Sequence, residues 1–294
     1  MGNENRVVNS AAADGSQPAA AVTPQAVTPQ AVTPQVARPG LARLLYGIGT
    51  WLQFLLLGAA LVPVLLLTPG LARRRRLVRT IARLALRLAG MRLEVRGLER
   101  LPEPCIVVAN HSSYLDGVVL CATLPPWFSF VIKREMSKVP LAGTLLRRIG
   151  AEFVTRGDRA GGNRTGGNRT GGARDARRLL RQAESGQALV FFPEGTFGSD
   201  IGLRHFHIGA FAAAVRAGLP LLPVVIHGTR RCLPPDSAWP RPGTIRIEAL
   251  VALTAHASAS EQDVREHALQ LRAAARAALL SVLGEPDLDP GARQ

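Results

Sequence analysis

The most pronounced hydrophobic pattern in the chain is a single apolar run near its start. Residues 44–68 contain 25 positions without a charged side chain, and arginines stand on both sides, most densely at 73–76. A helix of this length can cross the hydrocarbon core of a bilayer, which is about 30 Å thick. Pro63 leaves open a kinked or hairpin insertion into one leaflet, and a buried core helix is the less favoured alternative. Because the denser basic cluster follows the run, the positive-inside bias predicts attachment to the inner, cytoplasmic membrane with the rest of the chain on its cytoplasmic side.

A second helical pattern, rich in arginine, follows this run. Apolar side chains recur at helical spacing with cations between them: Leu77, Ile81, Leu84 and Leu88 alternate with Arg79, Arg83 and Arg87. This pattern is typical of a basic amphipathic helix that lies on anionic headgroups. A helix packed on a folded domain shows the same pattern and remains the alternative.

From residue 91 onward, short apolar runs alternate with helical stretches. The runs predict strands at 91–96, 105–109, 128–132, 151–155, 188–192, 221–226 and 244–251. The intervening patterns predict helices at 115–123, 139–149, 173–184, 208–217 and 261–283. This alternation predicts an α/β domain with a mostly parallel sheet flanked by helices.

Other segments lack any such period and delimit the domain. Residues 1–40 repeat AVTPQ three times, have few large apolar side chains and predict a disordered tail. The tandem glycine-rich repeat at 159–174 predicts a flexible surface loop. The expected organisation is therefore a membrane segment with its amphipathic helix at 41–90, one domain at 91–284 and a short tail at 285–294.

Composition narrows the class of partner. The 36 basic and 21 acidic residues give a net charge of +15, which favours an anionic partner such as a membrane surface or a phosphate-bearing substrate. Nucleic acid is the weaker candidate, because aromatic residues make up only 5% and none is interleaved with the arginines. The three cysteines are too few for a disulfide framework, and no Cys/His pair has zinc-ligand spacing. His205 and His207 lack a third ligand, so we expect no metal and no resident cofactor.

The strongest candidate for catalysis follows the predicted strand at 105–109. His111 comes just after this strand, and Asp116 stands five residues later. An imidazole can take a proton from an attacking hydroxyl, and a carboxylate on its other nitrogen fixes the tautomer. The neighbouring serines precede a predicted helix, where serine is a common cap, and no G-x-S-x-G turn is present. The pattern therefore predicts general-base catalysis without an acyl-enzyme.

Two further segments predict a binding site for an anion. The turn that follows the strand at 188–192 has backbone N–H groups and a hydroxyl that could hold one; it comprises Phe192, Pro193, Glu194, Gly195 and Thr196. Arg156 adds a cation just past another strand, where ligands gather in open parallel sheets.

Taken in order, these segments resemble the four sequence blocks of the glycerophospholipid acyltransferase family, which includes the lysophosphatidic acid acyltransferases. The blocks are Asn110-His111 with Asp116, Phe153 with Arg156, Phe192 to Thr196, and Leu219 to Val224, and they fall within about residues 91–250. The resemblance implies an acyl-CoA or acyl-carrier-protein donor, a lysophospholipid acceptor, and a tunnel facing the membrane lipids. It also implies that His111 is the base, that Asp116 is its partner, and that Arg156 and the Glu194-Gly195 turn hold the acceptor phosphate. Asn110 is expected to contact the substrate.

The chain departs from this family at two positions. Phe197 stands where the family usually has arginine, and His207 stands where it usually has lysine. Both changes remove positive charge beside the expected phosphate site, for which Arg204 or Lys133-Arg134 could compensate. The acceptor is therefore a lysophosphatidic acid, another lysophospholipid such as lysophosphatidylethanolamine, or a lyso-ornithine lipid. A lipid-binding protein that has lost turnover and a membrane-anchored nucleic-acid-binding protein are the alternatives from other classes.

Overall fold

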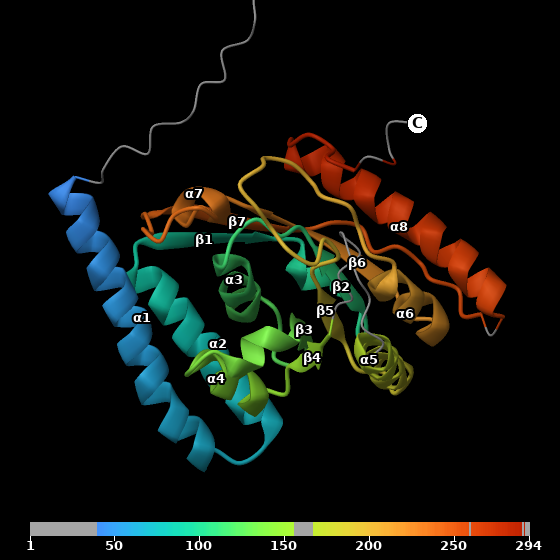
Figure 1. Ribbon diagram of the computed structural model, residues 1–294, viewed down its shortest axis with the longest axis horizontal. Helices are drawn as coiled ribbons and strands as arrows, with labels where there is room; N and C mark the ends of the chain where they lie inside the picture. Colours follow the sequence, from blue (N-terminus) through green and yellow to red (C-terminus); the bar gives the residue numbers. More distant parts are fainter. Residues whose placement is uncertain (1–39, 156–166, 259, 290, 292–294) are drawn as a thin grey trace, which may run out of the picture. The chain divides into compact units, whose positions relative to one another are not determined.

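The structure, a computed structural model, describes residues 40–155, 167–258, 260–289 and 291. Seven strands form one sheet in the order β1-β7-β6-β2-β5-β3-β4 (Figure 1). The strands are β1 (Met91–Arg96), β2 (Ile106–Ala109), β3 (Ser129–Lys133), β4 (Glu152–Val154), β5 (Leu189–Phe191), β6 (Leu221–His227) and β7 (Gly243–Ala249). All neighbouring strands run parallel except β6 and β7. The mostly parallel α/β fold is therefore confirmed.

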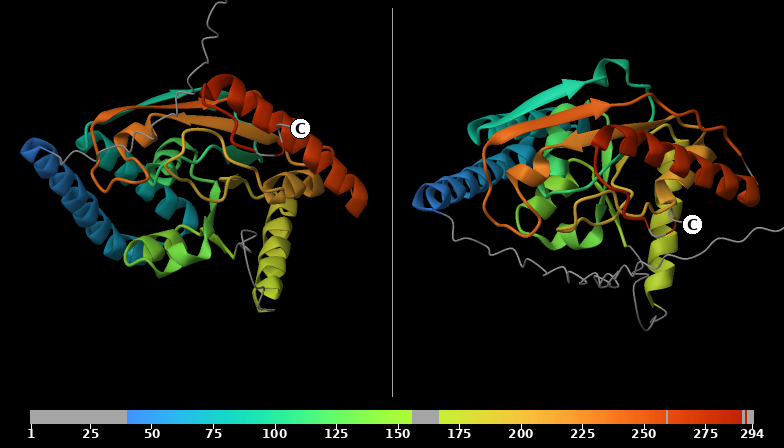
Figure 2. Two further views of the ribbon diagram at one scale, coloured as in Figure 1. Left: turned by 45° about the horizontal axis from the view of Figure 1, so that its top comes forward. Right: turned by 90° about the horizontal axis from the view of Figure 1, so that it is seen from above.

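Helices cover both faces of the sheet, as the two further views show (Figure 2). They are α1 (Leu41–Leu67), α2 (Leu71–Leu88), α3 (Leu115–Thr123), α4 (Ala142–Arg148), α5 (Gly167–Glu184), α6 (Gly209–Ala217), α7 (Thr229–Cys232) and α8 (Glu261–Leu283), with 3-10 turns at Leu98–Arg100 and Arg134–Lys138. Side chains of α5, α6 and α8 pack on one face of the sheet, and those of α2 and α3 pack on the other. Strand β2 is fully buried because it contributes alternate side chains to both cores.

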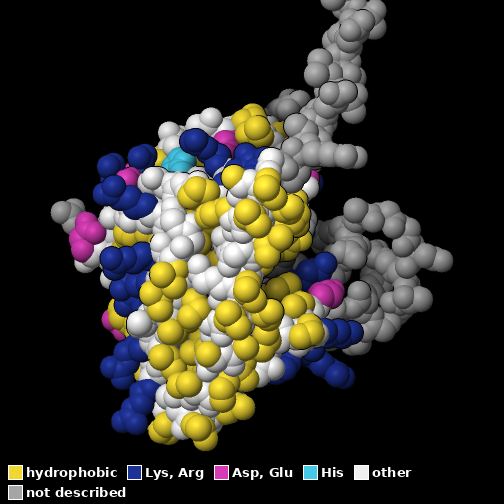
Figure 3. Space-filling view, turned by 90° about the vertical axis from the view of Figure 1, so that its left-hand side faces the viewer, with side chains coloured by type: hydrophobic (Ala, Val, Ile, Leu, Met, Phe, Trp, Pro, Cys, Tyr) yellow, Lys and Arg dark blue, Asp and Glu magenta, His cyan; other side chains and the backbone are white. Residues whose placement is uncertain are grey.

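Helix α1 has the dimensions of a membrane span. It is apolar enough to cross a membrane by length and composition, and its mean hydropathy is 2.1 over the most apolar window. Only 17% of that window is buried inside the protein. Apolar side chains gather on its outward face, with Lys and Arg side chains along the borders of that face (Figure 3). This exposure does not fit the alternative of a soluble core helix.

Helix α2 joins α1 to the domain. The Tyr46 hydroxyl and the Gln53 amide of α1 donate to the carbonyls of Ala89 and Ala85, at 2.5 and 2.7 Å. The buried side of α2 contributes Ala82 and Leu86 to the core beneath the sheet. The helix is thus packed on the domain, but Leu84 and Leu88 of its predicted apolar stripe stay exposed. Four of its arginines are exposed as well: Arg73, Arg76, Arg83 and Arg87.

Some sequence predictions were wrong in detail. The glycine-rich loop was expected to continue to residue 174, but α5 already begins at Gly167. Leu179 and Ala183 anchor the later turns of α5 in the core, and the helix extends from there into a segment of poor propensity. Residues 159–166 of that loop and all but the last residue of the predicted tail at 1–40 lie outside the described residues.

Residues 285–289, assigned to a C-terminal tail, contact the domain. Leu203 and Asp287 form an isolated bridge, and the backbone N–H of Leu288 donates to the carbonyl of Leu203. This segment therefore helps to hold the loop that follows β5.

Candidate active site

The candidate site lies at the carboxyl edge of the sheet, where β2 leads into α3. His111 follows the last residues of β2, and Asp116 lies in the first turn of α3. The turn between them brings the two side chains together, with His111 Nδ1 2.8 Å from Asp116 Oδ2. The predicted histidine–carboxylate pair is therefore present in the fold.

The surroundings of Asp116 favour one tautomer of His111. The carboxylate is fully buried, and Oδ2 also accepts the backbone N–H groups of Ser112 and Ser113 at 2.7 and 2.8 Å. An atom that already accepts two donors favours a third donor, so Nδ1 carries the proton and Nε2 is the basic nitrogen. Within the described residues, Asp116 Oδ1 is buried without a hydrogen-bond partner.

Aromatic rings enclose the imidazole. Phe192 stacks on His111 at 4.1 Å between ring centroids, and Phe197 meets it edge-on at 4.5 Å. Tyr114 packs against the other side of Phe197 at 4.7 Å. The His111 side chain keeps 17% of its surface exposed, so the ring is held firmly but remains reachable by a substrate.

Glu194 links the two halves of the site. Its Oε1 accepts the backbone N–H of His111 at 2.6 Å, and its Oε2 accepts that of Arg204 at 2.9 Å. Burial raises the pKa of the Glu194 carboxyl to about 7, although the two backbone donors oppose this effect. Both carboxylate oxygens have partners within the protein, so we assign Glu194 to positioning His111 rather than to contacting an anion.

This raised pKa predicts a pH-dependent stability. The native state holds the proton more tightly than the unfolded chain, whose ordinary value is 4.5. The stabilisation of the folded state by protonated Glu194 is therefore complete below pH 4.5 and is lost as the pH rises through 7. It amounts to about 3 kcal/mol in all. We expect the free energy of unfolding in detergent to fall from pH 5 to 8 in the wild type and to fall less in Glu194→Gln. Equal slopes in the two proteins would contradict the assignment.

Asn110 also positions the site. Its amide donates to the carbonyl of Ile226 at 3.0 Å and accepts the N–H of the same residue at 2.7 Å. The side chain is buried, and this pairing ties the end of β2 to β6. The structure thus gives Asn110 an internal partner, whereas the sequence suggested contact with substrate.

The turn after β5 has the shape that its sequence predicts. Gly195 has a φ of +77°, which glycine adopts without strain, and its N–H donates to the carbonyl of Phe192 at 3.0 Å. The Pro193 carbonyl accepts the N–H of His207 at 2.8 Å. Thr196 is exposed, with its hydroxyl 3.5 Å from the carbonyl of Phe197.

Arg204 lies beside this turn, with its backbone N–H bonded to Glu194. Its guanidinium lies over Gly198, where a Cβ would come within 2.5 Å of Arg204 Nη1. No ion pair or hydrogen bond is recorded for that guanidinium within the described residues. This guanidinium is therefore available to a ligand. It lies over the residue that follows Phe197, whose ring contacts His111.

Two arginines that the sequence did not identify hold this cation in place. Arg230 donates to the carbonyls of Gly198 and Asp200 at 3.0 and 2.9 Å. Arg276, from α8, donates to the Arg204 carbonyl at 2.6 Å and is paired with Asp287. They come from distant segments without a shared motif, so no local pattern could have identified them.

The remaining predicted cations are elsewhere or not described. Arg156 lies outside the described residues. Lys133 is exposed at the end of β3, and Arg134 forms an ion pair with Asp175 at 2.8 Å. His205 lies 3.0 Å from a carboxylate oxygen of Asp289. Among the predicted arginines and lysine that the structure describes, Arg204 is the one placed beside the turn.

Comparison with known proteins places this chain in a family. The acyltransferase family model matches residues 92–227. The 1-acyl-sn-glycerol-3-phosphate acyltransferase of Pseudomonas aeruginosa is 32% identical over 61% of this chain and 67% of its own length. A lyso-ornithine lipid O-acyltransferase of the same organism is 35% identical over 56% of this chain and 58% of its own length. The chain belongs to the acyltransferase family.

Two further comparisons bear on fold and length. The crystal structure of the 1-acyl-sn-glycerophosphate acyltransferase of Thermotoga maritima superimposes with a TM-score of 0.61, covering 80% of this chain and 95% of that chain at 22% identity. A chloroplast 1-acyl-sn-glycerol-3-phosphate acyltransferase of Brassica napus is 30% identical over 49% of this chain. The match spans only 40% of that plant protein. The Thermotoga structure supports the fold, and the Brassica protein shares a domain with this chain.

Proposed function

We propose that this protein is a lysophospholipid O-acyltransferase. It moves an acyl group from acyl-CoA or acyl carrier protein to the free hydroxyl of a lysophospholipid such as 1-acyl-sn-glycerol-3-phosphate, giving phosphatidic acid. The observation that carries the proposal is the pairing of His111 Nδ1 with the buried Asp116, which leaves Nε2 as a base at an accessible edge of the sheet. Family membership supports it.

In this reaction His111 takes up one proton and then returns it. Nε2 takes the proton of the acceptor hydroxyl as that oxygen attacks the thioester carbonyl, and Asp116 stabilises the imidazolium that forms. The C–S bond then breaks, and the departing thiolate takes the proton from His111. The new ester and the free thiol account for all atoms, so the only co-substrate is the acyl thioester.

The nearby serines are engaged in structural contacts, which supports direct transfer. The Ser112 hydroxyl lies 3.2 Å from that of Thr229, and the Ser113 hydroxyl donates to the Leu233 carbonyl at 2.8 Å. Both are buried. Neither therefore has the hydrogen bond to a base that a nucleophilic serine needs.

We further propose that α1 inserts into the inner membrane and that the domain lies on its cytoplasmic side. The apolar outward face of α1 supports insertion (Figure 3). The arginines at 73–76, which follow α1, support this orientation. Lysolipid and acylated product would then remain in the bilayer beside the domain.

The acceptor headgroup is the finer question. Phe197 places an apolar ring against His111, and the guanidinium of Arg204 lies over Gly198, the residue that follows Phe197. A lysolipid whose phosphate reaches Arg204 fits this arrangement. A lyso-ornithine lipid is the second candidate, because the ring beside the base carries no charge and one relative is named for that activity.

Arg204→Gln distinguishes these acceptors. For a phosphate-bearing lysolipid, we expect kcat/KM to fall by about 10-fold or more, because a charge-assisted hydrogen bond contributes about 1.5–3 kcal/mol. For a lyso-ornithine lipid we expect little change. The matched control is Arg231→Gln, which removes an exposed cation from α7. Rates with purified protein in detergent and a panel of lysolipids provide the test, and equal losses in both variants would contradict a specific role for Arg204.

A further inference from the structure

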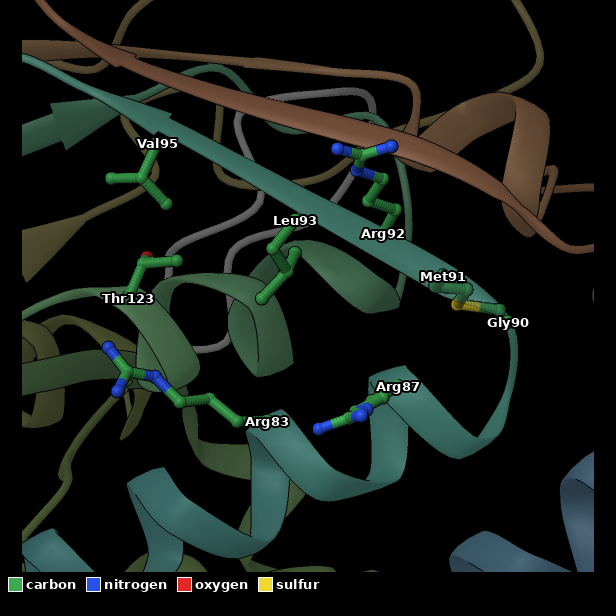
Figure 4. Close-up of a pocket in the computed structure, with 8 residues that line it drawn as sticks. All are labelled: Arg83, Arg87, Gly90, Met91, Arg92, Leu93, Val95 and Thr123. Carbon is green, nitrogen blue, oxygen red and sulfur yellow. The ribbon is translucent and has the colours of Figure 1, made fainter.

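A groove runs beside β1, away from the site described above. It has a volume of about 600 Å³ and lies between β1, the last turns of α2 and the end of α3 (Figure 4). Among the described strands, β1 pairs with β7 alone and therefore forms one edge of the sheet. Ligand sites in proteins commonly have volumes of about 300–1,000 Å³.

The floor of this groove is apolar. Leu93 and Val95 point from β1 into the space above α2, whereas Arg92 extends to the other side of the strand (Figure 4). Val95 is 45% exposed although it is a large apolar residue. An apolar strip that remains exposed beside an edge strand favours an apolar occupant.

The wall of the groove is cationic. Arg83 and Arg87 extend from successive turns of α2, and no acidic residue lines the groove (Figure 4). Arg83 Nε donates to the Ala122 carbonyl at 2.6 Å. In the part of the chain that the structure describes, no side-chain partner is recorded for Arg87. The nearest acid along β1, Glu94, lies beside Arg246 at 3.4 Å.

The groove shares helix α2 with the membrane helix. The carbonyls of Ala85, in α2, and of Ala89, just after it, accept hydrogen bonds from α1. These residues lie two positions after Arg83 and Arg87, so α1 and the groove lie on different sides of α2. Leu84 and Leu88 stand next to these arginines and are 40% and 59% exposed. A lipid that reaches this side of α2 would therefore meet apolar and cationic side chains together.

We propose that this groove binds one anionic phospholipid. The phosphate lies between Arg83 and Arg87, and one acyl chain lies along Leu93 and Val95. Charge complementarity and the apolar floor argue for an amphiphile over a free anion, which would leave the floor exposed. The site is separate from the acyl-transfer site, although Arg83 holds the last turn of α3, the helix whose first turn carries Asp116.

The test uses the full chain in a neutral detergent and a short-chain phosphatidylglycerol with a photoreactive group on one acyl chain. We expect crosslinks to the peptide that contains Leu93 and Val95, and weaker labelling by the matching phosphatidylcholine. Arg87→Gln should weaken phosphatidylglycerol binding by about fivefold, and the double variant with Arg83→Gln by more. Arg73→Gln with Arg76→Gln removes two exposed charges from the other end of α2 and should leave the labelling unchanged.

Several outcomes would overturn the proposal. One is an equal loss in the Arg73/Arg76 control, which would indicate attraction to the surface of the detergent–lipid micelle alone. Another is displacement of the probe by inorganic phosphate at equal concentration, which would indicate a simple anion site. A third is that added acyl carrier protein reduces labelling by the lipid probe while no crosslink maps to β1. If the double variant misfolds by circular dichroism, Arg87→Gln alone decides, because no side-chain contact is recorded for Arg87 within the described residues.

Discussion

Replacing His111 with alanine should reduce the rate of acyl transfer by about 10²–10⁴-fold, because the reaction loses its general base. The ring lies at the edge of the core with Phe192 and Phe197 on two sides, so its loss leaves a small cavity but no unpaired buried charge other than Asp116. The measurement is the initial rate of labelled product in detergent, with folding checked by circular dichroism.

The matched control is His256→Ala. His256 is exposed and follows the last strand, so its removal should leave the rate within about twofold. A folded His111→Ala protein that keeps more than a tenth of the wild-type rate would rule out His111 as the base.

Asp116→Asn should have the second largest effect, about 10²–10³-fold, because the imidazolium loses its preorganised counter-charge. The geometry should survive the change. Oδ2 accepts all three donors, whereas Oδ1 has no hydrogen-bond partner within the described residues. An asparagine can therefore place its oxygen where Oδ2 lies and its NH₂ group where Oδ1 lies. The rate is measured as for His111.

Asp116→Ala serves as the comparison. It leaves the buried N–H groups of Ser112 and Ser113 without an acceptor, at about 1–3 kcal/mol each, so it should destabilise the protein as well as slow it. If Asp116→Asn loses stability as strongly as Asp116→Ala, the carboxylate is chiefly structural and the charge argument fails.

The fold could be predicted largely from periodicity. The helices at 115–123 and 261–283 match α3 and α8 at both ends, because their apolar spacing is regular. Each predicted strand is present within two residues at either end. The buried central strands appear as short continuous apolar runs, whereas β1 and β7 alternate apolar and polar residues. The short α7 was missed because a helix of four residues has no period to detect.

The site was predictable only where local sequence sets the geometry. His111 and Asp116 are joined by one turn, so their pairing follows from a strand, a short loop and a helix start. The carboxylate of Glu194 instead accepts backbone N–H groups 83 residues away at His111 and 10 residues away at Arg204. The pattern showed a turn after β5, but only the tertiary structure shows that Glu194 points inward.

Phe197 illustrates a different limit of sequence reasoning. Its position one residue after the turn predicted a lost positive charge, but not the contact with His111 that replaces it. Ring stacking depends on side-chain directions that spacing along a chain does not determine. The reassignment of Asn110 has the same cause, since its partner Ile226 lies on another strand.

The central claim is that His111 drives direct transfer without an acyl-enzyme. The most direct measurement is a single turnover with labelled acyl thioester, following label on the lysolipid and on the protein at the same time. The proposal predicts labelled product from the wild type with no label on the protein at any time, and no product from His111→Ala. Label on the protein that precedes product would contradict direct transfer, and no product from the wild type with any acceptor would favour a non-catalytic lipid-binding protein.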